Sequence, residues 1–219
     1  MIFVNYKTYE EGSGQKAIAL TKVLEEVAHA SQVKIIPVVQ AIDAEMVIAS
    51  TALEIWIQHI DPLGYGAHTG WILPEEVAKV GVSGVFLNHS EHKFDDFDTL
   101  YATNEKAMAA NLKTLIFSGN LDELKKVCGL SPTYVAYEPP ELVGSTTTSV
   151  AEAKPEVISQ AAEIARAFGL PLIVGAGIHS MNDVKKSLEL GAVGVAVATD
   201  IVKATDPKKE LVELTEGFR

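Results

Sequence analysis

Short apolar runs alternate with longer amphipathic stretches along the whole chain. The apolar runs are rich in β-branched and aromatic residues and mostly lack strict alternation, which predicts strands buried on both faces. The expected strands are Ile2–Asn5, Val33–Val39, Glu54–Gln58, Gly84–Asn88, Lys113–Phe117, Thr133–Tyr137, Leu172–Gly175 and Gly194–Ala198.

The stretches between the expected strands have the apolar spacing of helices. They include Ser13–Ala30, Pro74–Val80, Asn104–Asn111, Leu121–Leu130, Pro155–Phe168 and Met181–Leu190. Ser13 and Ser180 suit N-cap positions, where a hydroxyl can accept from a free N–H. Pro74 and Pro155 suit first-turn positions, because no helical partner exists there for the missing N–H.

Strands that alternate with helices fit either a closed barrel or a doubly wound sheet. The eight strands, their even spacing and the lack of a G-x-G-x-x-G motif after the first strand favour an α/β protein with a (β/α)8 barrel, the TIM barrel. Residues 81–87 and 191–197 also share a pattern of helix end, glycine turn and strand start, as expected for two related half-barrels. With no linker or low-complexity tract, residues 1–219 are expected to form a single domain.

Composition narrows the expected partners. The net charge of −11 argues against nucleic acid and against an anionic membrane surface, since both require a basic face. A small anionic substrate remains compatible, because a few local donors can dominate a pocket. No run approaches the roughly 20 apolar residues of a membrane span, and no secretory signal is visible. The lone Cys128 cannot form an internal disulfide, so we expect a packing residue and a cytoplasmic protein.

Polar residues follow three of the expected strands directly. The first strand ends in Asn5-Tyr6-Lys7, the fourth in Asn88-His89-Ser90-Glu91 and the sixth in Tyr137-Glu138. Barrel enzymes carry their chemistry at the C-terminal strand ends, so these groups should share one mouth. An ammonium, an imidazole and a carboxylate there suit proton abstraction beside a carbonyl.

These segments resemble the three signature segments of triosephosphate isomerase. Asn5-Tyr6-Lys7-Thr8, Asn88-His89-Ser90-Glu91 and Ala136-Tyr137-Glu138-Pro139 agree in order, spacing and barrel position. Further similar segments are 58–62, 66–70 and 175–178, and residues 138–142 are similar to the compact archaeal branch. The resemblance implies a glycolytic and gluconeogenic enzyme without a cofactor, which interconverts dihydroxyacetone phosphate and D-glyceraldehyde 3-phosphate through an enediolate.

The resemblance also implies a role for each polar residue. Glu138 would carry the proton between C1 and C2, and His89 would polarise the carbonyl as an uncharged imidazole. Lys7 would hold the phosphate and stabilise the oxyanion, while Asn5 would orient Lys7 and donate a hydrogen bond. Support would come from two neighbours, the acidic partner Glu91 and Ser90.

Blander interpretations stand beside these roles. Glu138 could be an exposed loop carboxylate, Lys7 a surface lysine, and His89 a hydrogen-bonded core residue. His89 and His92 could also be a metal pair, but no third ligand is evident and the reaction needs no metal. We therefore expect no metal.

Backbone donors for the phosphate are expected in the turns after the seventh and eighth strands. These turns are Gly175-Ala176-Gly177 and Ala198-Thr199, and the N–H of Gly144 is a third candidate. Asp200 follows the second turn, where it would be harmless as a helix N-cap but unfavourable if it faced the phosphate. We expect the cap.

The segment from Pro139 to about Val150 resembles a lid that closes over substrate. Its usual Gly-Thr-Gly tip is replaced by Gly144-Ser145-Thr146-Thr147-Thr148, and threonine is stiffer than glycine, so lid kinetics should differ. The fifth strand ends in Phe117-Ser118, where the family often has a cysteine, so packing beside the base should be altered.

The long loop 58–73 concerns assembly. By the resemblance, Thr69 would approach Asn5 and Lys7 of a second subunit in a homodimer or homotetramer. Trp71 is a candidate interface anchor, because aromatic residues are enriched at such sites, although it could instead fold back on its own barrel.

Two other functions fit parts of the pattern. A pentulose-phosphate epimerase would need a metal cluster or a second acid–base carboxylate at the mouth. A barrel that binds sugar phosphate without turning it over would fit the altered lid.

Overall fold

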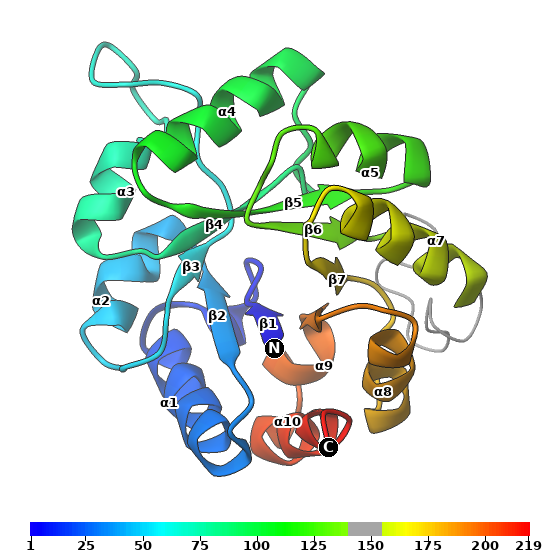
Figure 1. Ribbon diagram of the computed structural model, residues 1–219. Coiled ribbons are helices and arrows are strands. Elements are labelled where there is room, and N and C mark those ends of the chain that lie inside the picture. Colours follow the sequence, from blue (N-terminus) through cyan, green and yellow to red (C-terminus); the bar gives the residue numbers. More distant parts are fainter. Residues whose placement is uncertain (140–154) are drawn as a thin grey trace.

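The computed structural model describes residues 1–139 and 155–219. Eight parallel strands form a closed barrel in chain order, and helices surround it (Figure 1). The strands are β1 Ile2–Asn5, β2 Ile35–Val39, β3 Trp56–Ile57, β4 Gly84–Leu87, β5 Lys113–Ser118, β6 Tyr134–Tyr137, β7 Leu172–Val174 and β8 Gly194–Val197. The barrel closes because Ile2 pairs with Ile35 in β2 and with Val195 in β8. The predicted (β/α)8 barrel is confirmed.

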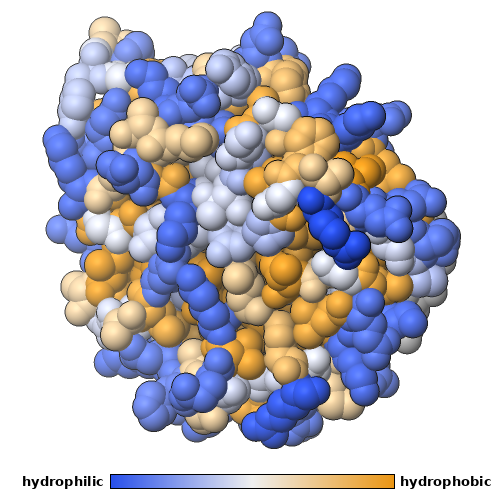
Figure 2. Space-filling view, viewed as in Figure 1, coloured by the Kyte–Doolittle hydropathy of each residue, from blue (hydrophilic) through white to orange (hydrophobic). Residues whose placement is uncertain are grey.

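The helices follow the strands along the chain, and the last two come after β8. They are α1 Gly14–Ser31, α2 Ala44–Ile48, α3 Pro74–Val80, α4 Phe97–Ala109, α5 Leu121–Cys128, α7 Pro155–Ala167, α8 Met181–Glu189, α9 Thr199–Val202 and α10 Pro207–Glu216, with 3-10 turns at Glu10–Gly12 and Ala41–Asp43. No helix in the described ranges is long and apolar enough to cross a membrane. Figure 2 shows hydrophilic side chains spread over this helical exterior, with apolar residues between them.

The helix starts differ in how well they match their predictions. Ser180 caps α8 by accepting from the Asp183 N–H, as predicted. Ser13 precedes α1, but its hydroxyl donates to the Tyr9 carbonyl instead of capping the helix. Helix α4 begins at Phe97, seven residues before the predicted start at Asn104, because Asp96 accepts from the Thr99 N–H and caps an earlier turn.

Two apolar layers build the core. The barrel interior holds aromatic rings from several strands, and the Phe3 ring lies 5.0 Å from Trp56 and 5.7 Å from Phe86 between centroids. The outer layer packs the opposite strand faces, such as Ile2 and Val4, against the helices. Cys128 is buried there, and burial raises the pKa of its thiol to about 11, which agrees with the predicted packing role.

The two repeated glycine segments have matching geometry. Gly81 and Gly191 end their helical segments with φ of 102° and 104°, which glycine adopts without strain. A Cβ on Gly84 would collide with the Trp56 ring, and a Cβ on Gly194 would collide with the Met1 carbonyl. In each half of the barrel, one glycine therefore permits a positive φ after a helix and the other permits a close contact at the start of a strand.

Candidate active site

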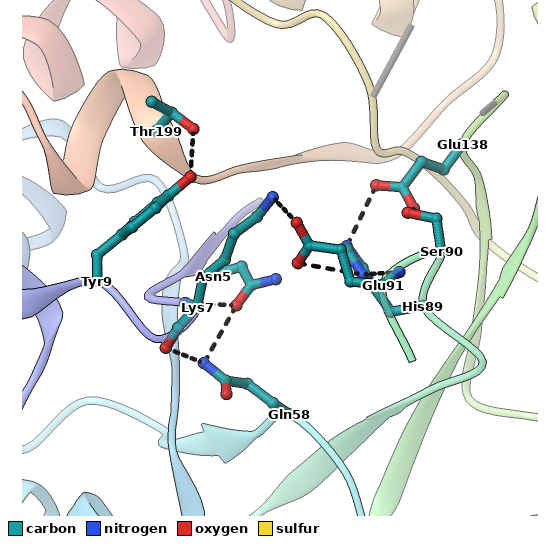
Figure 3. A network of polar contacts seen from close by, with 9 residues as sticks. All are labelled: Asn5, Lys7, Tyr9, Gln58, His89, Ser90, Glu91, Glu138 and Thr199. Carbon is teal, nitrogen blue, oxygen red and sulfur yellow. Dashed lines mark hydrogen bonds and ion pairs between the residues drawn. The ribbon is translucent and has the colours of Figure 1, made fainter. Parts of the chain in front are cut away.

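One pocket collects the predicted polar groups at the carboxyl ends of the strands. Asn5, Lys7, His89 and Glu138 line it, together with residues from 175–179 and 196–200. Figure 3 shows these side chains converging from three separate strand ends. The structure therefore brings together all four residues that sequence reasoning named as catalytic.

The end of β1 holds Lys7 in an unusual backbone conformation. Lys7 has φ of 48°, a left-handed value that is uncommon for a residue with a side chain. Asn5 stabilises it by accepting the Lys7 N–H at 2.9 Å, and Gln58 donates to the Lys7 carbonyl at 2.8 Å. The Gln58 amide also donates to Asn5 Oδ1 at 3.3 Å, so one amide fixes both residues.

The Lys7 side chain is directed at a carboxylate. Its Nζ lies 2.7 Å from Glu91 Oε1, and only 14% of the lysine side chain is exposed. Glu91 itself is half exposed, so this ion pair sits where the pocket meets solvent. Figure 3 shows the Lys7 ammonium pointing at the Glu91 carboxylate.

The residues after β4 fix the imidazole. Asn88 adopts φ of 59°, and its side-chain amide donates to the Phe117 carbonyl at 3.0 Å and to Glu123 Oε1 at 2.9 Å. This turn presents His89, whose ring packs edge-on against Phe117 with centroids 4.8 Å apart.

One hydrogen bond determines the tautomer of a neutral His89. Its Nδ1 accepts from the Glu91 backbone N–H at 3.2 Å, so the ring proton of an uncharged imidazole must lie on Nε2. That Nε2 lies 3.3 Å from Glu138 Oε1. The donor and the carboxylate consequently face the same space.

Glu138 is a buried carboxylate with two polar neighbours. The residue is only 4% exposed; besides His89, the Ser90 hydroxyl donates to its Oε2 at 2.9 Å. Its backbone N–H donates to the Ser118 carbonyl at 2.9 Å, which continues the β5–β6 ladder into the site. Gly175 leaves room for it, because a Cβ there would lie 3.4 Å from Glu138 Cβ and 3.3 Å from the Phe117 ring.

The turns after β7 and β8 line the same pocket as the residues after β1 and β4. Gly175, Ala176, Gly177, Ala198 and Thr199 all contribute to the pocket. Gly177 has φ of 64°, a conformation suited to glycine.

Thr199 begins α9, and its hydroxyl lies 3.0 Å from the Tyr9 hydroxyl. This contact joins the turn after β8 to the segment after β1 (Figure 3).

The prediction that Asp200 caps a helix is wrong. Ala198 is the residue before α9, and Asp200 lies inside the helix as its second residue. The Asp200 carboxylate instead lies 2.7 Å from Nδ1 of His179, and both residues line the pocket. The short helix begins two residues earlier than the cap interpretation required.

Sequence reasoning missed several residues that shape the site. Gln58 was visible only within a family-like segment, with no signal that its amide would reach Asn5 and Lys7. The polar residues Tyr9 and His179 lie on loops, where the spacing of apolar residues does not indicate which side chains face the pocket. The end of β5, where the sequence predicted altered packing, contributes two contacts. The Phe117 ring packs against His89, and the Ser118 hydroxyl donates to the Ala136 carbonyl at 2.8 Å.

The rings of His89 and His92 do not face a common position where they could bind one metal ion. His92 stacks on His59 at 4.0 Å between centroids, whereas His89 faces Glu138. Burial, and next the charge of His92, lower the pKa of His59. Across residues 1–139 and 155–219 there is no group of three side chains arranged to hold a metal ion.

Two further sets of predicted residues have different outcomes. In the loop after β3, Thr69 and Trp71 are both exposed, with 57% of Trp71 accessible. The predicted lid residues from 140 onward, including Gly144, Ser145, Thr146, Thr147 and Thr148, lie outside the described residues.

Comparisons with known proteins agree with one another. A family model described as triosephosphate isomerase matches residues 1–216. Triosephosphate isomerase of Methanocaldococcus jannaschii is 36% identical over 216 residues, covering 98% of each chain. That of Methanothermus fervidus is 37% identical over 216 residues, covering 98% of this chain and 96% of the relative. The crystal structure of triosephosphate isomerase from Bartonella henselae aligns with a TM-score of 0.78 over 100% of this chain and 98% of that one, at 17% identity, and so shows the shared fold.

Proposed function

The chain belongs to the triosephosphate isomerase family and interconverts dihydroxyacetone phosphate and D-glyceraldehyde 3-phosphate, and we propose that Glu138 is the base and His89 the electrophile of this reaction. The reaction is a step of glycolysis and gluconeogenesis. The observation that carries the assignment is the placement of His89 Nε2 3.3 Å from a carboxylate oxygen of Glu138, in a pocket that both residues line.

Glu138 removes the proton from C1 of dihydroxyacetone phosphate. As the C–H electrons move toward the carbonyl carbon, negative charge grows on the carbonyl oxygen, and His89 Nε2–H donates to it. The enediolate then receives the proton from Glu138 at C2, while one proton passes from the C1 hydroxyl to the C2 oxygen. This gives the aldehyde with its C2 hydroxyl and restores the carboxylate. Because Nε2 and Oε1 face the same space, one bound triose can contact both groups.

Ser90 positions the base. Its hydroxyl donates to Oε2, which leaves Oε1 as the oxygen nearest His89. Burial of Glu138 limits competition from water during the transfer.

Lys7 supplies positive charge for the oxyanion and the phosphate. The side chain is largely enclosed, lines the pocket and forms an ion pair with Glu91. Asn5 keeps the strained turn of Lys7 in place and adds a side-chain donor to the pocket.

The phosphate lies against the turns after β7 and β8. Backbone N–H groups of Gly175, Ala176, Gly177, Ala198 and Thr199 are its proposed donors, with Gly144 as a further donor from the segment outside the described residues. The segment from Pro139 to about Val150 acts as the lid that closes over substrate.

We further propose that residues 1–219 act as one domain within a cytoplasmic homodimer or homotetramer. Support comes from the exposed loop after β3, which carries Thr69 and a Trp71 that is 57% accessible. In such an assembly Thr69 approaches Asn5 and Lys7 of a second copy. A sizing column at micromolar concentration should show a multiple of the monomer mass, and monomeric behaviour would contradict this assembly.

The variant Glu138→Asp tests the role of the base. It retains the carboxylate but withdraws it by one methylene, and a displacement of about 1 Å can cost about 100-fold in rate. We expect kcat to fall by about that factor with little change in KM, measured in a coupled assay with dihydroxyacetone phosphate. Wild-type kcat in this variant would remove Glu138 from the mechanism.

A further inference from the structure

A histidine–aspartate pair bridges the two turns that face the phosphate. His179 follows the turn after β7, Asp200 lies in α9 after β8, and His179 Nδ1 lies 2.7 Å from Asp200 Oδ2. Both residues line the same pocket as Glu138 and Lys7. The triose mechanism uses neither side chain, so this contact requires its own explanation.

Asp200 puts a negative charge where the proposed function brings in a phosphate dianion. Its side chain is 42% exposed, so burial does not remove it from the pocket. The one ammonium among the described pocket residues belongs to Lys7, and it is already paired with Glu91. A freely rotating Asp200 carboxylate would therefore oppose the substrate by like-charge repulsion.

The backbone of His179 is anchored to helix α8. Its backbone N–H donates to Asp183 Oδ2 at 3.1 Å, and the same oxygen accepts from the Ser180 hydroxyl at 2.8 Å. Asp183 is 5% exposed and belongs to α8, so the loop that carries the ring is fixed to a helix. The ring therefore offers the Asp200 carboxylate a stationary partner.

The second ring nitrogen of His179 has no partner. Nε2 is buried and makes no hydrogen bond within the described part of the chain. Among the described residues, the ring therefore makes its polar contact through Nδ1, which lies beside Asp200.

From these contacts we propose that His179 is a positioning residue for phosphate recognition, which holds the Asp200 carboxylate against the imidazole and so keeps its charge from repelling the substrate phosphate. The inference rests on the proposed placement of the phosphate at the turns after β7 and β8. It makes the pair a determinant of substrate affinity and leaves the proton transfer to Glu138 and His89.

A double-mutant cycle between His179→Ala and Asp200→Asn tests this pair. His179→Ala should raise KM for dihydroxyacetone phosphate and the Kd for inorganic phosphate by about tenfold, with kcat within about twofold of wild type. Asp200→Asn removes the charge and should lower the Kd for inorganic phosphate. In the Asp200→Asn background, His179→Ala should then have almost no effect.

Two further variants guard against a merely structural explanation. His179→Asn keeps a side-chain N–H for Asp200 and should restore most of the affinity. His29→Ala removes an exposed histidine in the last turn of α1 that does not line the pocket, and it should change neither KM nor the Kd.

Several outcomes would overturn the proposal. They are an unchanged KM in His179→Ala, a loss confined to kcat, or an equal loss of affinity with and without the Asp200 charge. Calorimetry with inorganic phosphate reports on the pair independently of turnover. A wild-type protein that binds phosphate but does not isomerise the triose would instead contradict the catalytic assignment.

Discussion

Two glutamates at opposite ends of the same barrel have opposite surroundings. Glu54 precedes β3, and its carboxylate accepts from Lys34 at 2.7 Å, from Lys113 at 2.8 Å and from the Trp56 indole at 2.9 Å. Burial alone would raise the pKa of Glu54, but these hydrogen bonds outweigh it and lower the pKa to about 2. Its charge is therefore fixed throughout the ordinary pH range.

Glu138 follows β6 and has different partners. A serine hydroxyl and an imidazole lie beside its carboxylate, whereas the Lys7 ammonium is bonded to Glu91. A carboxylate saturated by ammonium groups is a poor base, because its negative charge is already stabilised. The neighbours of each glutamate therefore indicate its role. Lysines around Glu54 stabilise its charge and the fold, whereas the serine and histidine beside Glu138 leave it able to accept a proton.

The largest expected difference between the two glutamates is in kcat when each carboxylate is replaced by an amide. Glu138→Gln should lower kcat by about 1,000-fold or more, since the amide cannot accept the proton. Glu54→Gln should leave kcat within a few-fold of wild type. A coupled assay with dihydroxyacetone phosphate measures both, and similar losses in the two variants would contradict the division of roles.

The imidazole should be the next most sensitive group. His89→Gln replaces a fixed donor with a flexible one, and we expect kcat to fall about 100-fold, the usual cost of losing one oxyanion donor. Asp96→Asn, at the exposed cap of α4, serves as a control and should keep kcat. A His89→Gln enzyme with normal kcat would show that the carbonyl is polarised by another group.

Glu54 should matter for folding rather than for turnover. Glu54→Gln leaves two lysines without their shared carboxylate, and we expect the free energy of unfolding at pH 7 to fall by about 2 kcal/mol, allowing for partial solvent screening. Urea unfolding measures this change. Glu10→Gln, at the exposed ion pair with Lys16, should produce no measurable change, and an equal loss there would deny the Glu54 cluster its special role.

The smallest expected effect concerns pH. Because the folded pKa of Glu54 lies below its unfolded value, its contribution to stability is fully present above about pH 4.5 and is lost as the pH falls toward 2. The stability difference between wild type and Glu54→Gln should therefore shrink over that window. A difference that stays constant down to pH 2 would mean that the charge of Glu54 is not what stabilises the base of the barrel.

The strands could be predicted from the sequence more accurately than their ends. Strand positions followed from apolar runs, because each strand is buried on both faces and leaves a continuous signal. The strand ends were predicted too long at places such as Glu54–Gln58, where β3 covers only Trp56–Ile57. Glu54 and Gln58 lie outside the ladder and form hydrogen bonds through their side chains.

The candidate site could be predicted because its polar residues directly follow buried, apolar strands. Lys7, His89 and Glu138 stand out for that reason, and the structure places them around one pocket. Contacts between loops leave no such signal. The His179–Asp200 pair spans 21 positions and depends on where α9 begins, and a two-residue error in the cap position was enough to conceal it.

Isotope exchange in heavy water tests the central claim most directly. A base that lifts a proton from C1 exchanges it with solvent, so wild-type enzyme should place deuterium at C2 of the aldehyde and at C1 of recovered dihydroxyacetone phosphate, as seen by NMR. Glu138→Gln should incorporate none above the enzyme-free rate, while Glu54→Gln should match wild type. Undiminished incorporation by Glu138→Gln, or wild-type product without deuterium, would contradict the account.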